Sequence, residues 1–177
     1  MRPHRRRRSR LAVTLLSALT ALALVAAVAL LHHARGEAFQ QARTKSFAVG
    51  GCVTLPASGQ AQPAHCGQDP SYTVGAVADD GNCPSPVYQQ ASAPGTSATL
   101  CLVPNLVAEH CYRLSLPIGV LARSNCASQS RPDDGVLVQI TRRYDDIADR
   151  TACPQTAGNH VWPYPAPART YCTRTLI

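Results

Sequence analysis

The residues best suited to chemistry in this sequence are its eight cysteines. A free thiolate is a nucleophile and a metal ligand, whereas an even number of cysteines in an exported chain is typical of a disulfide framework. No Cys-x-x-Cys occurs, so the usual ligand spacing of a zinc ribbon and the thioredoxin-type redox pair are both missing. We therefore expect structural disulfides, with metal ligation and a catalytic thiol as the alternatives. The cysteines are Cys52, Cys66, Cys83, Cys101, Cys111, Cys126, Cys153 and Cys172.

The histidines offer a weaker signal for catalysis. Beyond residue 46 the chain has only His65, His110 and His160, and the first two each precede a cysteine directly. Neighbouring residues on an extended strand point to opposite faces, which disfavours a catalytic dyad or a shared metal site. No Gly-x-Ser-x-Gly, His-Glu-x-x-His, P-loop or dinucleotide fingerprint is present. The sequence thus predicts no catalytic, cofactor-binding or metal-binding residue.

Two acidic runs and one basic pair have simple structural explanations. Asp79-Asp80 and Asp145-Asp146, the latter followed by Asp149, lack the alternating pattern of a calcium-binding loop. We expect the first run in a solvated turn and the second on a solvated helix face. Arg142-Arg143 could meet an anionic envelope polymer, but two charges beside two acids are typical of a solvated surface.

The segment Trp162-Pro163-Tyr164-Pro165 is the strongest indication of a binding surface. Alternating prolines hold the backbone stiff and would present Trp162 and Tyr164 as a platform for a glycan ring or a partner peptide. Core packing inside the second half of the domain is the favoured expectation, because this is the only tryptophan of the chain, and the binding surface is the alternative.

Residues 11–31 form a run of 21 uncharged residues, mostly Leu, Ala and Val. A helix of that length spans about 31 Å, close to the roughly 30 Å of a bilayer's hydrocarbon core. Six arginines precede the run, so the positive-inside rule places the N-terminus in the cytoplasm and the C-terminal part outside. We expect an uncleaved signal anchor in a single-pass protein of the cell membrane.

Two other interpretations of this N-terminal segment are possible from the sequence. A cleaved signal peptide is the main one, with small-x-small triplets such as Ala27-Val28-Ala29 as cleavage sites. Lipid attachment at Cys52 is less favoured, because the polar residues 32–46 separate this cysteine from the apolar run.

The net charge of +7 is concentrated at the N-terminus. From residue 46 onward eight Arg and no Lys stand against nine acids, a net charge of −1. A nucleic-acid-binding domain would carry a basic patch on this part of the chain. The composition therefore predicts no nucleic-acid partner and argues against a purely soluble cytoplasmic protein.

The cysteines indicate an internal duplication. Residues 48–55 can be overlaid on residues 107–114, and the three later cysteines of each half follow in the same order. The intervals between cysteines are 14, 17 and 18 residues in the first unit and 15, 27 and 19 in the second. Only the middle interval differs, by 10 residues, as an insertion in one loop would produce.

The duplication narrows the pairing of the cysteines, since each unit should hold its own two bridges. Four bridges among eight cysteines allow 105 pairings on counting alone. We expect Cys52–Cys66 and Cys83–Cys101 in the first unit and Cys111–Cys126 and Cys153–Cys172 in the second. Such bridges matter because each unit has only about 55–75 residues, a size at which an unaided core is marginal.

The fold class expected is mainly β, with a small β-rich α+β fold as the variant. Thirteen of the 14 prolines follow the apolar run, which leaves little room for long helices. Residues 79–82 and 131–135 read as turns, residues 142–150 as one short helix that carries the insertion, and residues 32–45 as a continuation of the membrane helix. Strands are expected at residues 47–55, 71–77, 96–103 (ended by Pro104) and 136–141.

These motifs resemble the LppU-type family of actinobacterial envelope proteins, and septum-formation-associated domains have a similar opening. The resemblance covers residues 47–177 as two tandem units. Its members usually open on Gly-Asp-Cys, whereas this chain has Gly-Gly-Cys and, in the second unit, Glu-His-Cys. The motifs that carry it are Val49-Gly50-Gly51-Cys52-Val53, then Cys66, Tyr72-Thr73-Val74, Cys83 and Leu100-Cys101-Leu102.

The resemblance implies a membrane-tethered extracytoplasmic domain of unassigned activity, with no catalytic residues to transfer. The expected organisation is a cytoplasmic tail (1–10), a transmembrane anchor in the lipid bilayer (11–31), a stalk (32–46) and two β-rich units (47–104 and 105–177). We expect a non-enzymatic binding or scaffolding protein without a cofactor, whose partner is another envelope protein or a cell-wall polymer. The alternative is an anchored or secreted envelope hydrolase with a Cys or Ser/His site.

Overall fold

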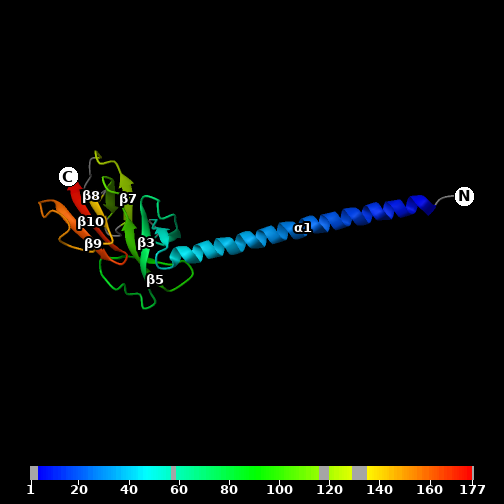
Figure 1. Cartoon of the computed structure of the whole chain (residues 1–177), viewed down its shortest axis with the longest axis horizontal. Coiled ribbons are helices and arrows are strands. Elements are labelled where there is room, and N and C mark those ends of the chain that lie inside the picture. The colour runs from blue at the N-terminus through cyan, green and yellow to red at the C-terminus, as the bar shows by residue number, and fades with distance from the viewer. Residues whose placement is uncertain (1–3, 57–58, 116–119, 129–134, 177) are drawn as a thin grey trace. The chain divides into compact units, whose positions relative to one another are not determined.

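The chain folds into two compact parts, Met1–Ala42 and Arg43–Ile177, and we call the second the β body. The computed structural model describes residues 4–56, 59–115, 120–128 and 135–176, with side chains from Leu22 onward except at 38, 42, 115 and 120. Within these residues one helix and ten strands are present (Figure 1).

Helix α1 runs from His4 to Phe47, so the apolar run and the predicted stalk form one continuous helix. Its large apolar side chains from Leu22 to Phe39 are exposed, among them Leu24 and Leu30, whereas Phe47 at its end packs against the core of the β body. The described portion Leu22–Phe47 is long and apolar enough to cross a membrane, a test that a signal sequence also passes. The protein therefore has one N-terminal apolar helix that could span a bilayer.

The β body consists of two five-stranded sheets that follow one another in the chain. The first unit contributes β1 (Cys52–Thr54), β2 (Gln62–Pro63), β3 (Ser71–Ala78), β4 (Gln89–Ser92) and β5 (Thr99–Asn105). The second contributes β6 (Cys111–Ser115), β7 (Val120–Ser124), β8 (Val136–Asp145), β9 (Asn159–Pro165) and β10 (Ala168–Leu176). The strand orders, β2-β1-β3-β5-β4 and β7-β6-β8-β10-β9, are the same when counted within each unit. This confirms the mainly β fold and its two tandem units.

The third strand of each unit carries a bulge at the same place. Gly75 is the extra residue of β3, where the register with β5 shifts beside Cys101. Thr141 is the extra residue of β8, where the register with β10 shifts beside Cys172. Because a bulge bends and twists its strand locally, the duplication extends to backbone detail.

The entry into each sheet is also built alike, although the residues differ. The Gly50 N–H donates to the Val74 carbonyl at 2.8 Å, and the Glu109 N–H donates to the Ile140 carbonyl at 2.7 Å. Gly50 has φ 84° and Glu109 has φ 66°, a region that few non-glycine residues adopt. The same hydrogen bond and backbone shape support the overlay of residues 48–55 on 107–114.

The four disulfides are the ones predicted. Cys52–Cys66 and Cys111–Cys126 tie the first strand of each unit to the residues that follow the second strand. Cys83–Cys101 and Cys153–Cys172 tie the loop before the fourth strand to the fifth. All eight cysteines are paired.

The helix predicted over residues 142–150 is wrong. Strand β8 continues to Asp145, which lies opposite Arg169 of β10. The helical spacing of Tyr144 and Ile147 is overridden, because pairing with β10 satisfies the backbone of this segment and continues the sheet.

The insertion of the second unit is divided between two loops. Gln139 follows Cys126 by 13 residues, whereas its equivalent Thr73 follows Cys66 by seven. Six extra residues therefore lie between Cys126 and Gln139, and the other four lie between the bulge and Cys153. The sequence predicts the insertion at residues 142–150, and only the four residues before Cys153 agree with that position.

Three other predicted boundaries shift. The strand expected at residues 47–55 is only Cys52–Thr54, because α1 continues to Phe47 and the turn at Gly50 separates the two. Pro104 lies inside β5 rather than ending it. It is tolerated there because β4 pairs with β5 only as far as Leu102. The turn expected at residues 131–135 falls largely outside the described residues.

The two units share one hydrophobic core. A single cluster of buried side chains includes Val74 and Leu102 of the first unit and Tyr112, Ile140 and Tyr171 of the second. The fully buried Tyr171 hydroxyl donates to the Pro104 carbonyl at 2.6 Å and accepts from the Leu106 N–H at 3.1 Å. The units therefore stabilise each other, which offsets the small size of each one.

A carboxylate at the end of β8 supports the connection between the units. Asp145 accepts from Arg143 Nη2 at 2.8 Å and from Arg169 Nε at 3.1 Å. A different nitrogen of each guanidinium reaches the connection: Arg143 Nη1 donates to the Leu106 carbonyl and Arg169 Nη1 to the Asn105 side chain. Asp145 thus orients two arginines that hold residues 104–106 in place.

This arrangement predicts a pH dependence of stability. The Arg143 hydrogen bond, followed by the charges of Arg143 and Arg169, lowers the pKa of Asp145 below its usual value. A lowered folded-state pKa contributes stability that is present above about pH 4 and is lost as the pH falls through the folded-state value. We expect Asp145→Asn to unfold at lower urea concentration than the parent at pH 7, with the difference shrinking as the pH falls below about 4. Asp79→Asn is the matched control, and an equal effect of both variants at pH 7 would contradict the role of Asp145.

Candidate ligand-binding pocket

Trp162 and Tyr164 lie on β9, an edge strand of the second sheet. Tyr164 is only 8% exposed, and Trp162 is half-buried and packs against the shared core. They therefore do not form an open platform. Both side chains instead line one pocket of about 380 Å³, so core packing and access to a ligand occur at the same residues.

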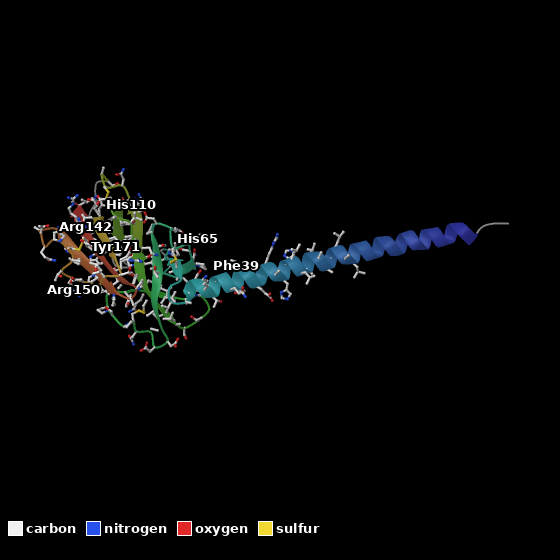
Figure 2. All side chains as sticks on the ribbon, viewed as in Figure 1. Phe39, His65, His110, Arg142, Arg150 and Tyr171 are labelled. Atoms are coloured by element: carbon white, nitrogen blue, oxygen red, sulfur yellow. A yellow bond between two sulfur atoms is a disulfide. The ribbon has the colours of Figure 1, made fainter. Side chains whose placement is uncertain are left out.

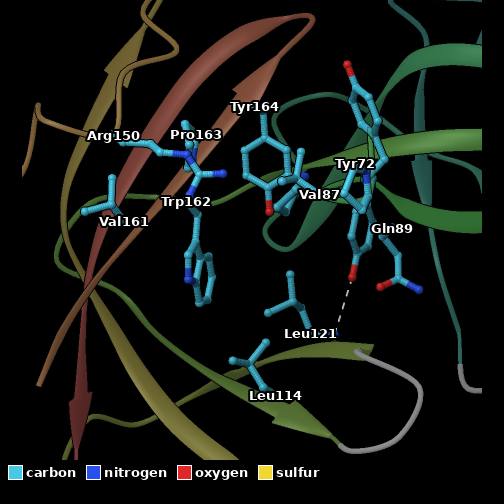
Figure 3. Close-up of a pocket in the computed structure, with 13 residues that line it drawn as sticks. Tyr72, Val87, Gln89, Leu114, Leu121, Arg150, Val161, Trp162, Pro163 and Tyr164 are labelled. Atoms are coloured by element: carbon cyan, nitrogen blue, oxygen red, sulfur yellow. Dashed lines mark hydrogen bonds between the residues drawn. The ribbon is translucent and has the colours of Figure 1, made fainter. Parts of the chain in front are cut away.

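The pocket walls are mostly apolar (Figure 3). Four aromatic rings line it, those of Tyr72, Tyr88, Trp162 and Tyr164. Pockets for small molecules have this character, with few polar groups among apolar walls and volumes of about 300–1,000 Å³. The other lining residues are Pro86, Val87, Gln89, Pro104, Leu114, Leu121, Arg150, Val161 and Pro163.

Both units are needed to build the pocket. The first unit supplies Tyr72 from β3, residues 86–88 before β4 and Gln89 at the start of β4. The second supplies Leu114 from β6, Leu121 from β7 and the aromatic residues of β9. The Leu121 N–H donates to the Tyr72 hydroxyl at 3.4 Å and joins the two walls directly.

The pocket is lined asymmetrically with respect to the duplication. The register places Ala91 opposite Leu100 and Trp162 opposite Tyr171, which makes Ala91 the counterpart of Trp162. Two residues further on, Ala93 is the counterpart of Tyr164. The second unit thus places large rings where the first has buried methyl groups. Aligning the sequences of the two units as far as these positions would also have paired the two alanines with Trp162 and Tyr164.

Arg150 offers only hydrogen-bond donors to the pocket, whereas the hydroxyls of Tyr72 and Tyr164 and the carboxamide of Gln89 can both donate and accept. The Tyr164 hydroxyl has no hydrogen-bond partner among the described residues, and Figure 3 shows it pointing into the pocket. Burial raises the pKa of the Tyr164 and Tyr72 phenols, so both stay neutral and keep their protons. The Arg150 side chain is exposed at this site and forms no ion pair within the described residues. These groups suit a ligand whose polar end accepts hydrogen bonds.

One wall is fixed by a tight contact between the units. The Tyr88 hydroxyl donates to the Ala166 carbonyl at 3.0 Å and accepts from the Ala166 N–H at 3.1 Å. The backbone of Gly75 approaches the same carbonyl so closely that a Cβ at this position would lie 2.1 Å from the oxygen. This contact holds the turn between β9 and β10 against the first unit.

The three histidines are not brought together (Figure 2 labels His65 and His110). His65 and His160 are exposed, whereas His110 is half-buried and its Nδ1 lies 2.7 Å from Asp69 Oδ2. Asp69, which stands in no sequence motif and was not predicted, also accepts from the Tyr112 hydroxyl and from Arg123 Nη1. Within the described residues no serine or threonine hydroxyl bonds to His110, so this cluster joins the two units rather than forming a complete catalytic triad.

The acidic runs and the arginine pair have intramolecular partners. Asp80 accepts from the Asn82 N–H in a turn, and Asp149 accepts from Thr151. Arg142 donates to Tyr144 on the surface. No group of three or more potential metal ligands occurs in the described part of the chain.

Comparison with known proteins adds no identification: no protein-family model, curated protein or solved structure matches this chain. The resemblance to the LppU-type family therefore stays a prediction. The features that bear on function are the pocket, its donors and the disulfide-bonded body that contains it.

Proposed function

We propose that this chain is a membrane-tethered binding protein of the cell envelope, with its β body outside the cytoplasm and no catalytic role. The pocket lined by Trp162 and Tyr164 is the observation that carries the proposal. It combines an accessible volume of about 380 Å³ with aromatic walls, as ligand sites do.

Two features support the location. All eight cysteines are in disulfides, which persist in oxidising compartments outside the cytoplasm. The single apolar helix precedes the β body in the chain, and its N-terminal arginines favour the cytoplasmic side. Together they agree with a domain held at the outer face of a membrane, where it would meet envelope proteins, wall polymers and lipids.

A hydrolase is the second candidate, because Asp69 bonds to His110 as the acid of a triad bonds to its histidine. Against it, Arg123 and Tyr112 share the same carboxylate, and every thiol of the chain is paired. Asp69 is better explained as the centre of a contact between the units. A His110→Ala variant that still binds the ligand of the pocket as the parent does would agree with this explanation.

The proposal is tested by site-specific photo-crosslinking of the full chain in its native envelope. A photoreactive amino acid replaces Pro86, an exposed residue that lines the pocket. The matched control replaces Val77, which is 41% exposed and lies outside the pocket. We expect a discrete adduct of defined mass at position 86 and none at 77. Absence of an adduct at position 86, or the same adduct at both positions, would contradict a ligand in this pocket.

A further inference from the structure

We propose that the pocket binds a small apolar molecule carrying one carboxylate or phosphate group, an inference that rests on the binding function proposed above. The anionic group would meet Arg150 and the tyrosine hydroxyls, and the apolar part would contact Trp162 and the aliphatic walls.

The first support is an unsatisfied donor. Tyr164 is 8% exposed, yet its hydroxyl has no hydrogen-bond partner among the described residues and points into the pocket (Figure 3). The hydroxyl oxygen is not one of the fully buried atoms without a partner, so it is open to the pocket and takes its hydrogen-bond partner from whatever fills that space. An acceptor atom on a bound molecule would supply one.

The second support is the charge and the hydrogen-bond donors of the polar side chains in the pocket. Tyr72 accepts the Leu121 N–H, which leaves its own proton free to donate, and Arg150 offers only donors. Among the described residues no carboxylate lines the pocket. Donors with one positive charge favour an anionic oxygen group and disfavour a cation, and a guanidinium binds carboxylate or phosphate in a bidentate manner.

The third support is the character of the remaining walls. Leu114, Leu121 and Val87 face the pocket together with three prolines and the Trp162 ring. Apolar surface of this kind gains free energy by covering an apolar ligand. A sugar ring carries hydroxyls around most of its edge, and the apolar side chains that form most of these walls offer them no hydrogen-bond partner. The chemistry therefore favours an amphiphile over a glycan.

Two sources could supply such a molecule: a free anionic amphiphile, or an anionic lipid of the bilayer that α1 enters. Both present an acyl-type chain next to a carboxylate or phosphate. The chemistry required of the pocket is the same in the two cases.

The experiment uses the emission of Trp162, the only tryptophan of the chain, in full-length protein reconstituted into phosphatidylcholine vesicles. Octanoate, octyl phosphate, octanol and octyltrimethylammonium are titrated separately, because they share one chain length and differ in charge. We expect a saturable change in emission with the two anions, at least tenfold weaker binding of octanol, and no saturable change with the cation. A parallel set of vesicles contains phosphatidic acid, and a change there without added probe would identify the bilayer as the source.

Variants separate the pocket from non-specific partitioning into the vesicle. Arg150→Gln and Tyr164→Phe should each weaken octanoate binding about tenfold or more, with little effect on octanol. Arg174→Gln is the matched control, because Arg174 is exposed and contacts Gln139 outside the pocket. Equal effects of Arg150→Gln and Arg174→Gln would overturn the assignment of the anion site.

The outcomes also distinguish this inference from the proposed function. If N-acetylglucosamine changes Trp162 emission and octanoate does not, the pocket binds a ligand of another class and the inference is wrong. If no probe changes Trp162 emission but position 86 still crosslinks to one defined partner, the binding function is supported and the anionic amphiphile is the wrong class of ligand. If neither assay detects a ligand, both proposals fail.

Discussion

Removing the disulfide between Cys83 and Cys101 in the double variant C83A/C101A should lower the free energy of unfolding by about 2–5 kcal/mol. The bridge spans a sequence separation of 18 residues, and closing a loop of about that size is worth roughly 3 kcal/mol in the chain-entropy model. Cys101 is fully buried in β5, between β3 and β4, so the variant also loses packing at the middle of the first sheet.

Urea unfolding of the full chain in detergent, followed by Trp162 emission, measures this loss. The double variant is used because a single replacement would leave a buried thiol free to exchange with other bridges. C153A/C172A removes the equivalent bridge of the second unit and should cost a similar amount. In the parent, mass spectrometry should detect eight alkylated cysteines only after reduction. Alkylation before reduction, or a loss below about 1 kcal/mol, would contradict this structural role.

Replacing Gly75 with alanine should destabilise the β body by about 1–3 kcal/mol or more, because the new methyl group has no space. Its Cβ would lie 2.1 Å from the Ala166 carbonyl oxygen and 3.0 Å from the Tyr88 ring. The obstruction is backbone, and Tyr88 holds the same residue by two hydrogen bonds. The turn between β9 and β10 must therefore move away from the first unit.

Two comparisons isolate this effect. Gly67→Ala is the matched control, since a Cβ there meets nothing within 4 Å. The equivalent bulge position of the second unit is Thr141, which shows that the bulge itself accepts a β-branched residue. Equal urea midpoints for Gly75→Ala and Gly67→Ala would show that the contact with Ala166 is not tight in solution.

The disulfides and the duplication could be predicted because the signals for them are local. Cysteine type, spacing and order are visible in one dimension, and the oxidised pairs follow from two units of similar length. The strand at residues 71–77 was recognisable for the same reason, since β-branched residues cluster there. In contrast, residues 142–145 carry a weak helical spacing, and only their pairing with β10 decides their conformation.

The pocket was predictable in part. Trp162 and Tyr164 stand out by residue type, but the opposite wall comes from Tyr72 and Tyr88 of the first unit, more than 70 residues earlier in the chain. No periodicity in the sequence encodes that two sheets share one core. Asp69 was missed for a related reason: its partners His110, Tyr112 and Arg123 belong to the other unit.

The strand order also fixes when each sheet can be completed during synthesis. In both units the fifth strand lies between the third and the fourth. The fourth strand therefore has no neighbouring strand to pair with until the fifth has been synthesised. The bridges Cys52–Cys66 and Cys111–Cys126 close within early segments and can oxidise as soon as these emerge. Cys83 and Cys153 must remain reduced until the later strand arrives with Cys101 or Cys172. Oxidation is thus staggered along the emerging chain, and each unit passes through an interval with one open thiol and an unfilled gap in its sheet.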